Sequence, residues 1–371
     1  VSHGLFAALS VLVVACPCAV GLATPVALAA GLNKAARNHI LIRDTSALEQ
    51  MRNVDVVVFD KTGTLTEGHP TVIGWLWAQG QEEHYKDVLL AAESTSDHPL
   101  AEAIVTALEG EEQVIPAHLD GFENITGKGV RVAYQGAEYW VGSHKLLKDY
   151  QANLSDILAD MLTQYESDGN SIVYFGREND LLAVIAIKDQ LRVTSMEAIR
   201  ELRIQDIEIC MLTGDGERTA SSVAGSLGIM RFVADAMPDD KEDFIHKLQL
   251  QGKTVAMVGD GVNDAQALSC ADVSIAMGKG TDTLMDTAMI TLRTSDLLLL
   301  PKVFRLSRQT VSLMYRNLFW AFIYNTVGIF VAAGVLYPVY DILLSPALAG
   351  AAMALSCVSV ALSSLRLSSR F

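Results

Sequence analysis

The stretch that decides the fold runs from residue 54 to residue 66 and reads VDVVVFDKTGTLT. Its opening part is mostly β-branched and apolar, which is typical of a strand buried on both faces of a parallel sheet. Asp60 follows that strand directly, and open α/β sheets bind ligands at the carboxyl ends of their strands. Gly63 and the small hydroxyl residues around it allow backbone N–H groups to approach a phosphate. Taken alone, Asp60 could be an ordinary strand-to-turn aspartate, but an aspartate in this place can also form an aspartyl-phosphate.

Two further apolar runs end in aspartate motifs of the same kind. Residues 207–212 lead into the TGD motif of residues 213–215, and residues 253–258 lead into the GDGVND motif of residues 259–264. Because the carboxyl ends of parallel strands meet at one edge of a sheet, we expect these motifs to form one acidic pocket. Such a pocket suits Mg²⁺, which prefers carboxylates, water and phosphate oxygens. Lys241 is placed to neutralise a transferred phosphoryl group there.

These motifs resemble those of the P-type ATPases, which share their phosphorylation domain with the haloacid dehalogenase superfamily. Residues 60–64 match the DKTGT motif of that family residue for residue. The resemblance implies that Asp60 is the phosphorylated nucleophile and that Thr62 holds phosphate and, through its carbonyl, Mg²⁺. The implied catalytic residues are Asp60, Lys61, Thr62, Thr213, Lys241 and Asn263, and the implied Mg²⁺ ligands are Asp60, Thr62, Asp260 and Asp264. Gln266 departs from the usual proline of the family, at a position outside the chemistry.

Residues 75–182 interrupt the phosphorylation domain and form a smaller predicted α/β unit. Its motifs are individually weak, because a His-Pro dipeptide is usually a helix-start turn and Gly-x-Gly is usually a hairpin. In their order along the chain, however, they resemble the nucleotide-binding domain of the heavy-metal-transporting P-type ATPases. The resemblance implies ATP contacts at Glu93, His98, Gly127, Gly129 and Gly142, and Asp215 is added to this cofactor-binding set.

Composition points to a membrane protein with a large acidic insert. The chain has 371 residues, a formal net charge of −15 and 50% hydrophobic residues. That apolar content excludes disorder, and the acidic charge disfavours binding to nucleic acid. Uncharged apolar runs cover Gly4–Asn33, Leu318–Tyr337 and Ile342–Leu365, each long enough to cross a bilayer. The sequence therefore predicts three transmembrane helices, of which the last two form a hairpin.

Basic residues at the ends of these runs predict the orientation. They are Lys34, Arg37 and Arg43 after the first run, Lys302, Arg305, Arg308 and Arg316 before the second, and Arg366 and Arg370 after the third. By the positive-inside rule, the soluble insert and the C-terminus are cytoplasmic. The expected location is a multi-pass position in the plasma (inner) membrane.

The predicted fold class is membrane α-helical plus α/β. It combines three transmembrane helices with a haloacid-dehalogenase-like, Rossmann-type phosphorylation domain and an inserted α/β nucleotide-binding domain. The predicted division is a transmembrane helix with a CPC motif at 1–35, a phosphorylation domain at 36–74 and 183–300, a nucleotide-binding domain at 75–182, and a transmembrane hairpin and tail at 301–371.

A pair of cysteines in the first apolar run predicts a metal site. Cys16-Pro17-Cys18 lies near the middle of the run, and proline disrupts the helix there and exposes carbonyls. Two thiolates beside such a break form a soft site suited to Cu(I) or to Zn²⁺-class ions. Two cysteines one residue apart rarely form a disulfide, so we expect free thiols. Cys210 and Cys270 are interpreted as structural.

The other two apolar runs narrow the choice of ion. Tyr324-Asn325 and the segment from Met353 to Cys357 resemble the YN and MxxSS motifs of the Cu(I)-transporting branch of the family. Zinc, cadmium and lead pumps carry a Lys and an Asp in these runs, and neither charge occurs here. The resemblance implies sulfur ligands at Cys16, Cys18 and Met353, with Tyr324 and Asn325 in the transport path. Cys357 replaces a serine of the family motif and either adds a thiol to the site or packs.

The expected function is ATP-driven Cu(I) export through an aspartyl-phosphate on Asp60. The expected cofactors and partners are ATP, Mg²⁺, transported Cu(I), membrane lipid and a soluble copper carrier, with no nucleic acid. The sequence begins with Val and lacks the TGE-containing actuator domain and earlier helices of the family, so we expect part of a longer pump that does not turn over alone. The alternatives are a Zn²⁺ or Cd²⁺ pump, a membrane-tethered phosphatase of the dehalogenase superfamily, and a metal-sensing or storage protein.

Overall fold

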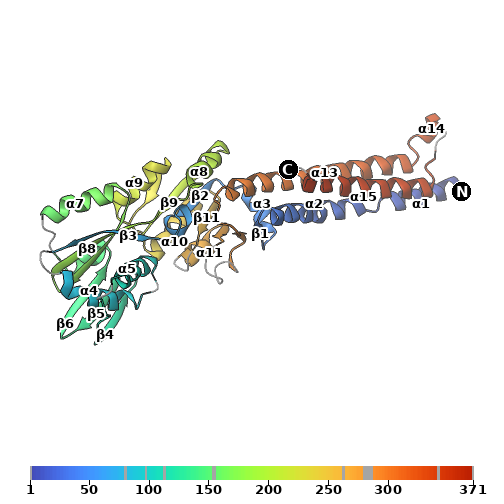
Figure 1. Ribbon diagram of the computed structural model, residues 1–371. Coiled ribbons are helices and arrows are strands. Elements are labelled where there is room, and N and C mark those ends of the chain that lie inside the picture. The colour runs from blue at the N-terminus through green and yellow to red at the C-terminus, as the bar shows by residue number, and fades with distance from the viewer. Residues whose placement is uncertain are drawn as a thin grey trace. The chain divides into compact units, whose positions relative to one another are not determined.

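The computed structural model describes residues 2–78, 82–96, 98–111, 114–152, 156–260, 264–278, 287–340 and 343–369. The chain divides into two compact units, which Figure 1 shows as a group of long helices and an α/β body. The first unit comprises Val1–Asn53, Met289–Arg293 and Leu299–Phe371, and the second comprises Val54–Ala288 and Thr294–Leu298. Residues 36–53, which the sequence assigned to the phosphorylation domain, therefore belong to the helical unit.

The first unit is built from long helices that pack side by side (Figure 1). Ala19, Ala23 and Ala27 recur every four residues on α2 and are fully buried, so a stripe of small side chains lets neighbouring helices approach closely. Gly31 continues the stripe against Thr310. The elements of this unit are α1 (Ser2–Val14), α2 (Cys18–Arg37), α3 (Ser46–Arg52), α13 (Leu299–Ala332), α14 (Tyr337–Tyr340) and α15 (Pro346–Ser369), with β1 (Ile40–Ile42) antiparallel to β13 (Ile290–Leu292).

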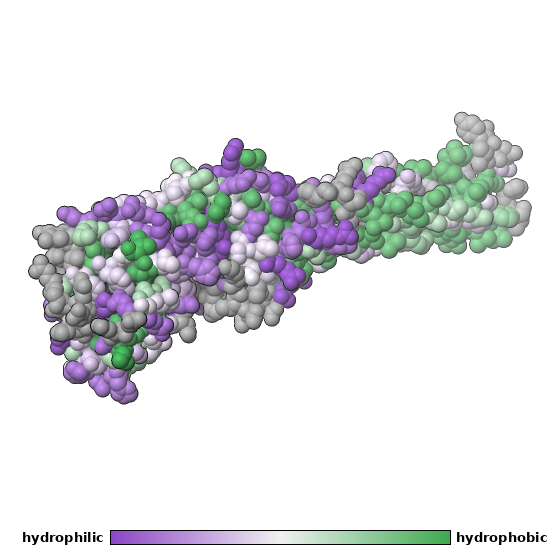
Figure 2. All heavy atoms as spheres, viewed as in Figure 1, coloured by the Kyte–Doolittle hydropathy of each residue, from purple (hydrophilic) through white to green (hydrophobic). Residues whose placement is uncertain are grey.

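The prediction of three membrane spans is not confirmed. Among the described residues, two helical stretches are long and apolar enough to cross a bilayer, Gly4–Arg37 and Pro346–Leu367. The second predicted span, Leu318–Tyr337, falls mostly in α13 and is the one not found, because polar Tyr324 and Asn325 interrupt its apolar sequence. Figure 2 nevertheless shows a predominantly hydrophobic surface over the long helices on the visible face.

The second unit contains the predicted parallel sheet. Its strands run in the order β12-β11-β2-β9-β10, and each pairs in parallel with its neighbour. Every residue of β2, β11 and β12 is buried, which explains why these strands consist almost entirely of apolar residues. The strands are β2 (Val56–Asp60), β9 (Glu208–Leu212), β10 (Arg231–Val233), β11 (Val255–Gly259) and β12 (Val273–Met277), and the helices are α8 (Ser195–Ile204), α9 (Glu217–Leu227), α10 (Pro238–Leu250) and α11 (Ala265–Cys270).

A six-stranded antiparallel sheet is inserted into this unit, with strand order β3-β8-β7-β6-β5-β4. The sheet reaches Thr71 at one end and Lys188 at the other, a few residues beyond the predicted limits of 75 and 182. Its strands are β3 (Thr71–Trp77), β4 (Gly121–Ile125), β5 (Gly129–Tyr134), β6 (Ala137–Gly142), β7 (Ser171–Arg177) and β8 (Asp180–Lys188), with helices α4 (Glu82–Glu93), α5 (Pro99–Glu109), α6 (His144–Asp149) and α7 (Asp156–Ser167).

Candidate phosphorylation and metal sites

Asp60 is the last residue of β2 and is 6% exposed. Because β2 lies between β9 and β11, its carboxylate stands where three parallel strands end together. Lys241 of α10 reaches it from the side, with Nζ 2.6 Å from Asp60 Oδ1 and 2.7 Å from Asp264 Oδ1. Asp264 directly precedes α11, so one buried ammonium joins two segments distant in sequence.

The charge of Lys241 is fixed by these carboxylates. Burial disfavours the ammonium form, but Asp60 and Asp264 outweigh that cost and hold the pKa above its ordinary value. Lys241 is therefore protonated across the neutral range. A permanent positive charge beside Asp60 suits a transferred phosphoryl group, whose oxygens carry negative charge.

Three carboxylates gather around this position. Ligand oxygens of Asp60, Asp260 and Asp264 lie within 4.8 Å of one another. Burial, followed by repulsion from Asp60 and Asp264, raises the pKa of Asp260 to about 7. A hard divalent cation relieves such repulsion, so the oxygen-only donor set fits Mg²⁺. Asn263, which the sequence assigns to this pocket, lies outside the described residues.

Gly63 controls how closely the DKTGT loop approaches that pocket. The loop forms η1 (Lys61–Leu65), a single turn in which Thr62 is extended and Gly63 has a φ of +71°. A Cβ at Gly63 would stand 1.4 Å from Asp260 Oδ2. Only glycine therefore satisfies both the left-handed backbone and the contact with Asp260.

Lys61 points to a second carboxylate instead of Asp60. Its Nζ forms an ion pair with Asp215 and lies 3.1 Å from Ser171 Oγ. Burial opposes the charge of Asp215, but Lys61 overcomes it and keeps the pKa of that carboxyl below its ordinary value. Thr213 Oγ1 also donates to Asp215 Oδ2 at 3.2 Å. The TGD motif thus holds the phosphorylation loop in place through Lys61.

Two further residues that hold the DKTGT loop in place were not predicted from the sequence. Asp189 accepts hydrogen bonds from Thr66 Oγ1 at 2.5 Å and from Gly68 N at 3.1 Å. Arg192 donates from Nε to the Thr64 carbonyl at 2.9 Å and from Nη2 to the Gly63 carbonyl. A signal existed for Asp189, because it comes directly after the apolar run of β8.

Two of the residues assigned to ATP lie at the ends of neighbouring helices. Glu93 ends α4 and is 6% exposed, and burial raises its pKa to about 7. His98 caps α5, where Nδ1 accepts a hydrogen bond from Leu100 N at 3.2 Å. The ring is exposed, yet surrounding protein desolvates it and lowers its pKa, with opposing electrostatic contributions from Asp215 and Lys61. His98 is therefore close enough to sense the charges of the phosphorylation site.

The three glycines of the predicted nucleotide site also come together. Gly129 of β5 pairs with Gly142 of β6. A Cβ on Gly129 would stand 2.6 Å from the Gly142 Cα, and one on Gly142 would stand 2.2 Å from the Lys128 carbonyl oxygen. Gly127 has a φ of +69°, and a Cβ there would stand 2.6 Å from Met237 Cε. Gly129 and Gly142 require glycine because the two strands approach backbone to backbone, whereas Gly127 favours glycine because of its left-handed φ.

The CPC motif breaks the first long helical stretch. α1 ends at Val14 and α2 begins at Cys18, with Pro17 at the junction. Contrary to the expectation of free thiols, Cys16 and Cys18 form a disulfide. Residues two apart point to different sides of an unbroken helix, so the break at Pro17 is what turns the two side chains toward each other and lets the sulfurs meet, with the Cα atoms 5.5 Å apart. In this oxidised form the pair offers no thiolate to a metal.

The remaining predicted metal ligands divide between two buried clusters of the helical unit. Met353 is 9% exposed and packs in a cluster that includes Val14 and Cys16. Cys357 packs one turn further along α15, in a cluster that includes Ala19. The structure therefore brings Met353 beside Cys16. Tyr324 is 52% exposed, whereas Asn325 is partly buried.

With this geometry in view, comparison with known proteins identifies the class. Residues 54–272 match the haloacid dehalogenase-like hydrolase family. The chain belongs to that family and, within it, to the P-type ATPases.

Its relatives are named for metal export. The chain is 44% identical over 366 residues to a copper-exporting P-type ATPase of Legionella pneumophila, covering 99% of this chain and 50% of the relative. It is 45% identical over 371 residues to a silver exporting P-type ATPase of Salmonella typhimurium, covering 99% of this chain and 44% of the relative. The chain thus spans about half the length of the curated relatives it matches.

Solved structures agree with this family. A zinc-transporting PIB-type ATPase in an E2.Pi state aligns with a TM-score of 0.66 at 34% identity, covering 95% of this chain and 56% of that chain. The catalytic domain of the CPx-ATPase CopB-B aligns with a TM-score of 0.61 at 28% identity, covering 73% of this chain and 97% of that chain.

Proposed function

We propose that this chain is the catalytic and metal-binding part of an ATP-driven Cu(I) exporter that forms an aspartyl-phosphate on Asp60. The observation that carries the proposal is the contact of Lys241 Nζ with Asp60 Oδ1 at 2.6 Å, inside a pocket that also holds Asp260 and Asp264. A nucleophilic carboxylate, a fixed cation and a divalent-cation site are the parts that phosphoryl transfer from ATP needs.

In the proposed reaction, a carboxylate oxygen of Asp60 attacks the γ-phosphorus of ATP. The new O–P bond forms as the bond to the β-phosphate oxygen breaks, and ADP leaves. Lys241 neutralises charge on the phosphoryl oxygens, while Lys61, held by Asp215, fixes the loop that presents the nucleophile. Asp60, Asp260 and the Thr62 carbonyl would hold Mg²⁺, with Asn263 and Asp264 in support, and the bound ion would supply further neutralisation of charge.

The nucleotide is proposed to lie against the inserted sheet. Glu93 and His98 would contact the adenine side, and the backbone at Gly127, Gly129 and Gly142 would approach the phosphates. The backbone-to-backbone packing of Gly129 and Gly142 supports this assignment, because it leaves no side chain where these ends of β5 and β6 pair. The proposed nucleotide-binding domain is residues 75–182, set within a phosphorylation domain predicted at residues 36–74 and 183–300, of which residues 36–53 pack with the helical unit.

The transported ion is proposed to bind the reduced CPC motif. Cys16 and Cys18 would offer thiolates once reduced, and Met353, packed in the cluster of Cys16, would add a thioether. This sulfur-rich, uncharged set suits Cu(I), with Tyr324 and Asn325 on the path and Cys357 as a further thiol. The names of the copper-exporting and silver exporting relatives support a soft monovalent ion.

The rest of the proposal concerns setting. The chain would lie in the plasma membrane, with the α/β unit cytoplasmic and a soluble copper carrier delivering the ion. An actuator domain and earlier helices would come from the part of the relatives' length that this chain does not match.

The test uses the full-length protein that contains this chain, reduced and in detergent. Cu(I), Ag(I) and Zn²⁺ are compared for stimulation of ATP-derived phosphate on Asp60, with Asp60→Asn as the blank. We expect stimulation by Cu(I) and Ag(I), and its loss in Cys16→Ser. Stimulation by Zn²⁺ alone would replace the copper assignment with a zinc pump, in line with the zinc-transporting structural relative. Phosphate-ester hydrolysis without acid-stable, ATP-derived phosphate on Asp60 would indicate a phosphatase, and metal tolerance unchanged by Asp60→Asn would indicate a sensor or store.

A further inference from the structure

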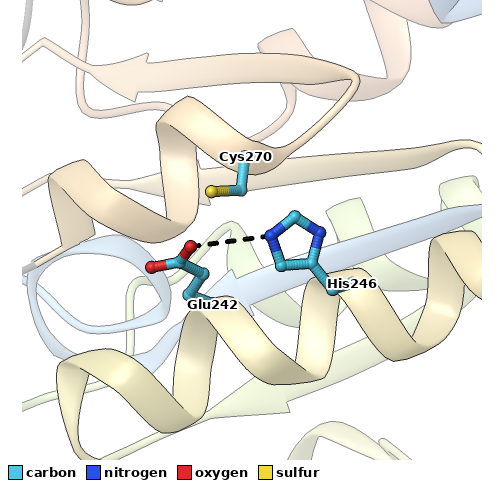
Figure 3. Close-up of side chains that lie close together, drawn as sticks. All are labelled: Glu242, His246 and Cys270. Atoms are coloured by element: carbon cyan, nitrogen blue, oxygen red, sulfur yellow. Dashed lines mark ion pairs between the residues drawn. The ribbon is translucent and has the colours of Figure 1, made fainter.

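A cluster of mixed metal-binding side chains lies on α10 and α11, apart from both sites above. Glu242 and His246 are one helical turn apart on α10, with His246 Nε2 3.5 Å from Glu242 Oε1. Cys270 is the last residue of α11, which packs against α10. In Figure 3 the sulfur of Cys270 points toward this pair. Ligand atoms of Glu242, His246 and Cys270 lie within 4.8 Å of one another.

The histidine ring is oriented for binding by a neighbouring amide. His246 Nδ1 lies 3.1 Å from Gln249 Oε1, and an amide oxygen can only accept, so Nδ1 carries the proton. That tautomer leaves the lone pair of Nε2 on the side of Glu242 and Cys270. The side-chain amide nitrogen of Gln249 also donates a hydrogen bond to the backbone carbonyl of Cys270 at 2.9 Å. One side chain thus positions both a histidine ligand and the backbone of the cysteine, as outer partners of metal ligands do.

The donor set selects the kind of ion. One sulfur, one imidazole nitrogen and one carboxylate oxygen suit a borderline divalent cation such as Zn²⁺, whereas Cu(I) prefers sulfur and Mg²⁺ prefers oxygen. Tetrahedral bonds to Zn²⁺ place ligand atoms about 3.3–3.8 Å apart. The His246–Glu242 distance of 3.5 Å already lies in this range, so only the distances to the Cys270 sulfur, each at most 4.8 Å, need to shorten. The side chains of His246 and Glu242 are 51% and 36% exposed, which leaves them room to move toward that sulfur.

We propose that Glu242, His246 and Cys270 form a binding site for one Zn²⁺-class ion, with a fourth position open to solvent. The site is independent of phosphorylation chemistry, but it uses the same two helices. Glu242 follows Lys241 along α10, and Cys270 ends the helix that Asp264 begins. A bound ion therefore links α10, which carries Lys241, to α11, which Asp264 directly precedes.

The test uses the full chain in detergent with Cys16, Cys18 and Cys357 replaced by serine, so that no membrane thiol competes. Co²⁺ serves as the probe, with excess Mg²⁺ to occupy the pocket of Asp60. We expect one Co²⁺ per chain with a sulfur-to-cobalt charge-transfer band, and displacement of that Co²⁺ by Zn²⁺. Cys270→Ser should remove the band, and His246→Gln should weaken binding by about tenfold or more.

Cys210→Ala is the matched control, because Cys210 is fully buried in β9 and should leave the band unchanged. Circular dichroism checks that each variant is folded, and if Cys270→Ser is not, the exposed His246→Gln decides. The proposal is overturned if no band forms, if the band survives Cys270→Ser, or if His246→Gln and Glu242→Gln bind Co²⁺ as tightly as the parent. In those cases Glu242 and His246 form only an ordinary helix-surface ion pair beside a cysteine.

Discussion

At the scale of single residues, Lys241 is the group on which the phosphorylation pocket depends. Its ammonium lies between the carboxylates of Asp60 and Asp264 and keeps them close. Lys241→Ala should therefore slow phosphorylation of Asp60 by about 100-fold or more, because a buried charge that stabilises the transferring group is lost. The rate of ATP-derived phosphate incorporation measures this. Lys247→Ala, an exposed lysine of the same helix, should leave the rate unchanged; equal effects of both substitutions would show that Lys241 acts only through general charge.

Gly63 allows steric contact and backbone strain to be separated. Gly63→Ala places a Cβ where the Asp260 carboxylate now lies, and it also strains a left-handed backbone. We expect the Mg²⁺ concentration that half-saturates phosphorylation to rise at least tenfold. Gly136→Ala provides the matched control, since Gly136 has a φ of +76° but no atom within 4 Å of the added Cβ. That variant should lose about 1 kcal/mol of stability and keep its Mg²⁺ dependence. An unchanged Mg²⁺ requirement in Gly63→Ala would contradict the assignment of Asp260.

Glu93 predicts a pH dependence of stability. Its pKa is about 7 in the folded protein against an ordinary 4.5, so between these values the folded state retains a proton that the unfolded chain has lost. The free energy of unfolding should then fall as pH rises from about 4.5 to about 7. Glu93→Gln removes this pH dependence. Between pH 4.5 and 7, the free energy of unfolding of the variant should therefore rise relative to that of the parent by up to about 3 kcal/mol.

Urea unfolding between pH 4.5 and 8, followed by tryptophan fluorescence, measures this difference, because Trp75, Trp77 and Trp140 all lie in the inserted sheet. Glu102→Gln, at an exposed position of α5, should follow the parent at every pH. Parallel pH profiles for Glu93→Gln and the parent would refute the prediction.

Much of the phosphorylation site could be predicted from single residues. Asp60, Asp260, Asp264 and Lys241 meet as the strand-end pattern and the family resemblance indicated. Arg192 was not predictable, because its role is to hold two loop carbonyls and such contacts leave no periodic signal. The pairing of Lys61 with Asp215 was missed for a similar reason, since it depends on where two strands end side by side.

At the scale of elements, the small-residue stripe of α2 sets how closely the long helices pack. Ala27→Leu forces a larger side chain into a fully buried position and should lower the stability of the helical unit by about 1–3 kcal/mol. Thermal unfolding in detergent measures the effect. Ala29→Leu, two residues along on an exposed face, should change little. If both substitutions behave alike, helix packing does not depend on the stripe.

The same scale shows which elements a sequence can define. The apolar runs of β2, β9 and β11 were predictable because a parallel strand buried on both faces is written almost without polar residues. The predicted limits of the inserted sheet were less accurate, since β3 begins with alternating exposed and partly buried residues and so has no sharp start in the sequence. The Cys16–Cys18 disulfide could not be predicted, because it depends on how far the chain unwinds at Pro17.

At the scale of the whole molecule, the contrast between apolar content and a charge of −15 resolves into two units of different character. Sequence patterns predicted a division of this kind, because uncharged runs and charged segments alternate only a few times along the chain. They grouped residues 36–53 with the charged part, since α3 carries Glu49 and Arg52, whereas α3 and the uncharged β1 pack with the helical unit.

The way the inserted domain joins its host has a mechanical consequence. The segment that leads into the inserted domain, residues 65–67, is hydrogen-bonded to the segment that returns from it, residues 190–192. Thr66 forms a β-bridge with Leu191, Glu67 N donates to the Gln190 carbonyl at 2.8 Å, and Arg192 N donates to the Leu65 carbonyl at 3.0 Å. Two segments hydrogen-bonded in this way resist separation but can rotate together, so they act as one hinge instead of two independent linkers. Because that hinge begins immediately after the DKTGT loop, any rotation of the inserted domain is applied as torque within a few residues of Asp60. If the inserted domain closes over a nucleotide as proposed above, that closure and the alignment of Asp60 are a single movement.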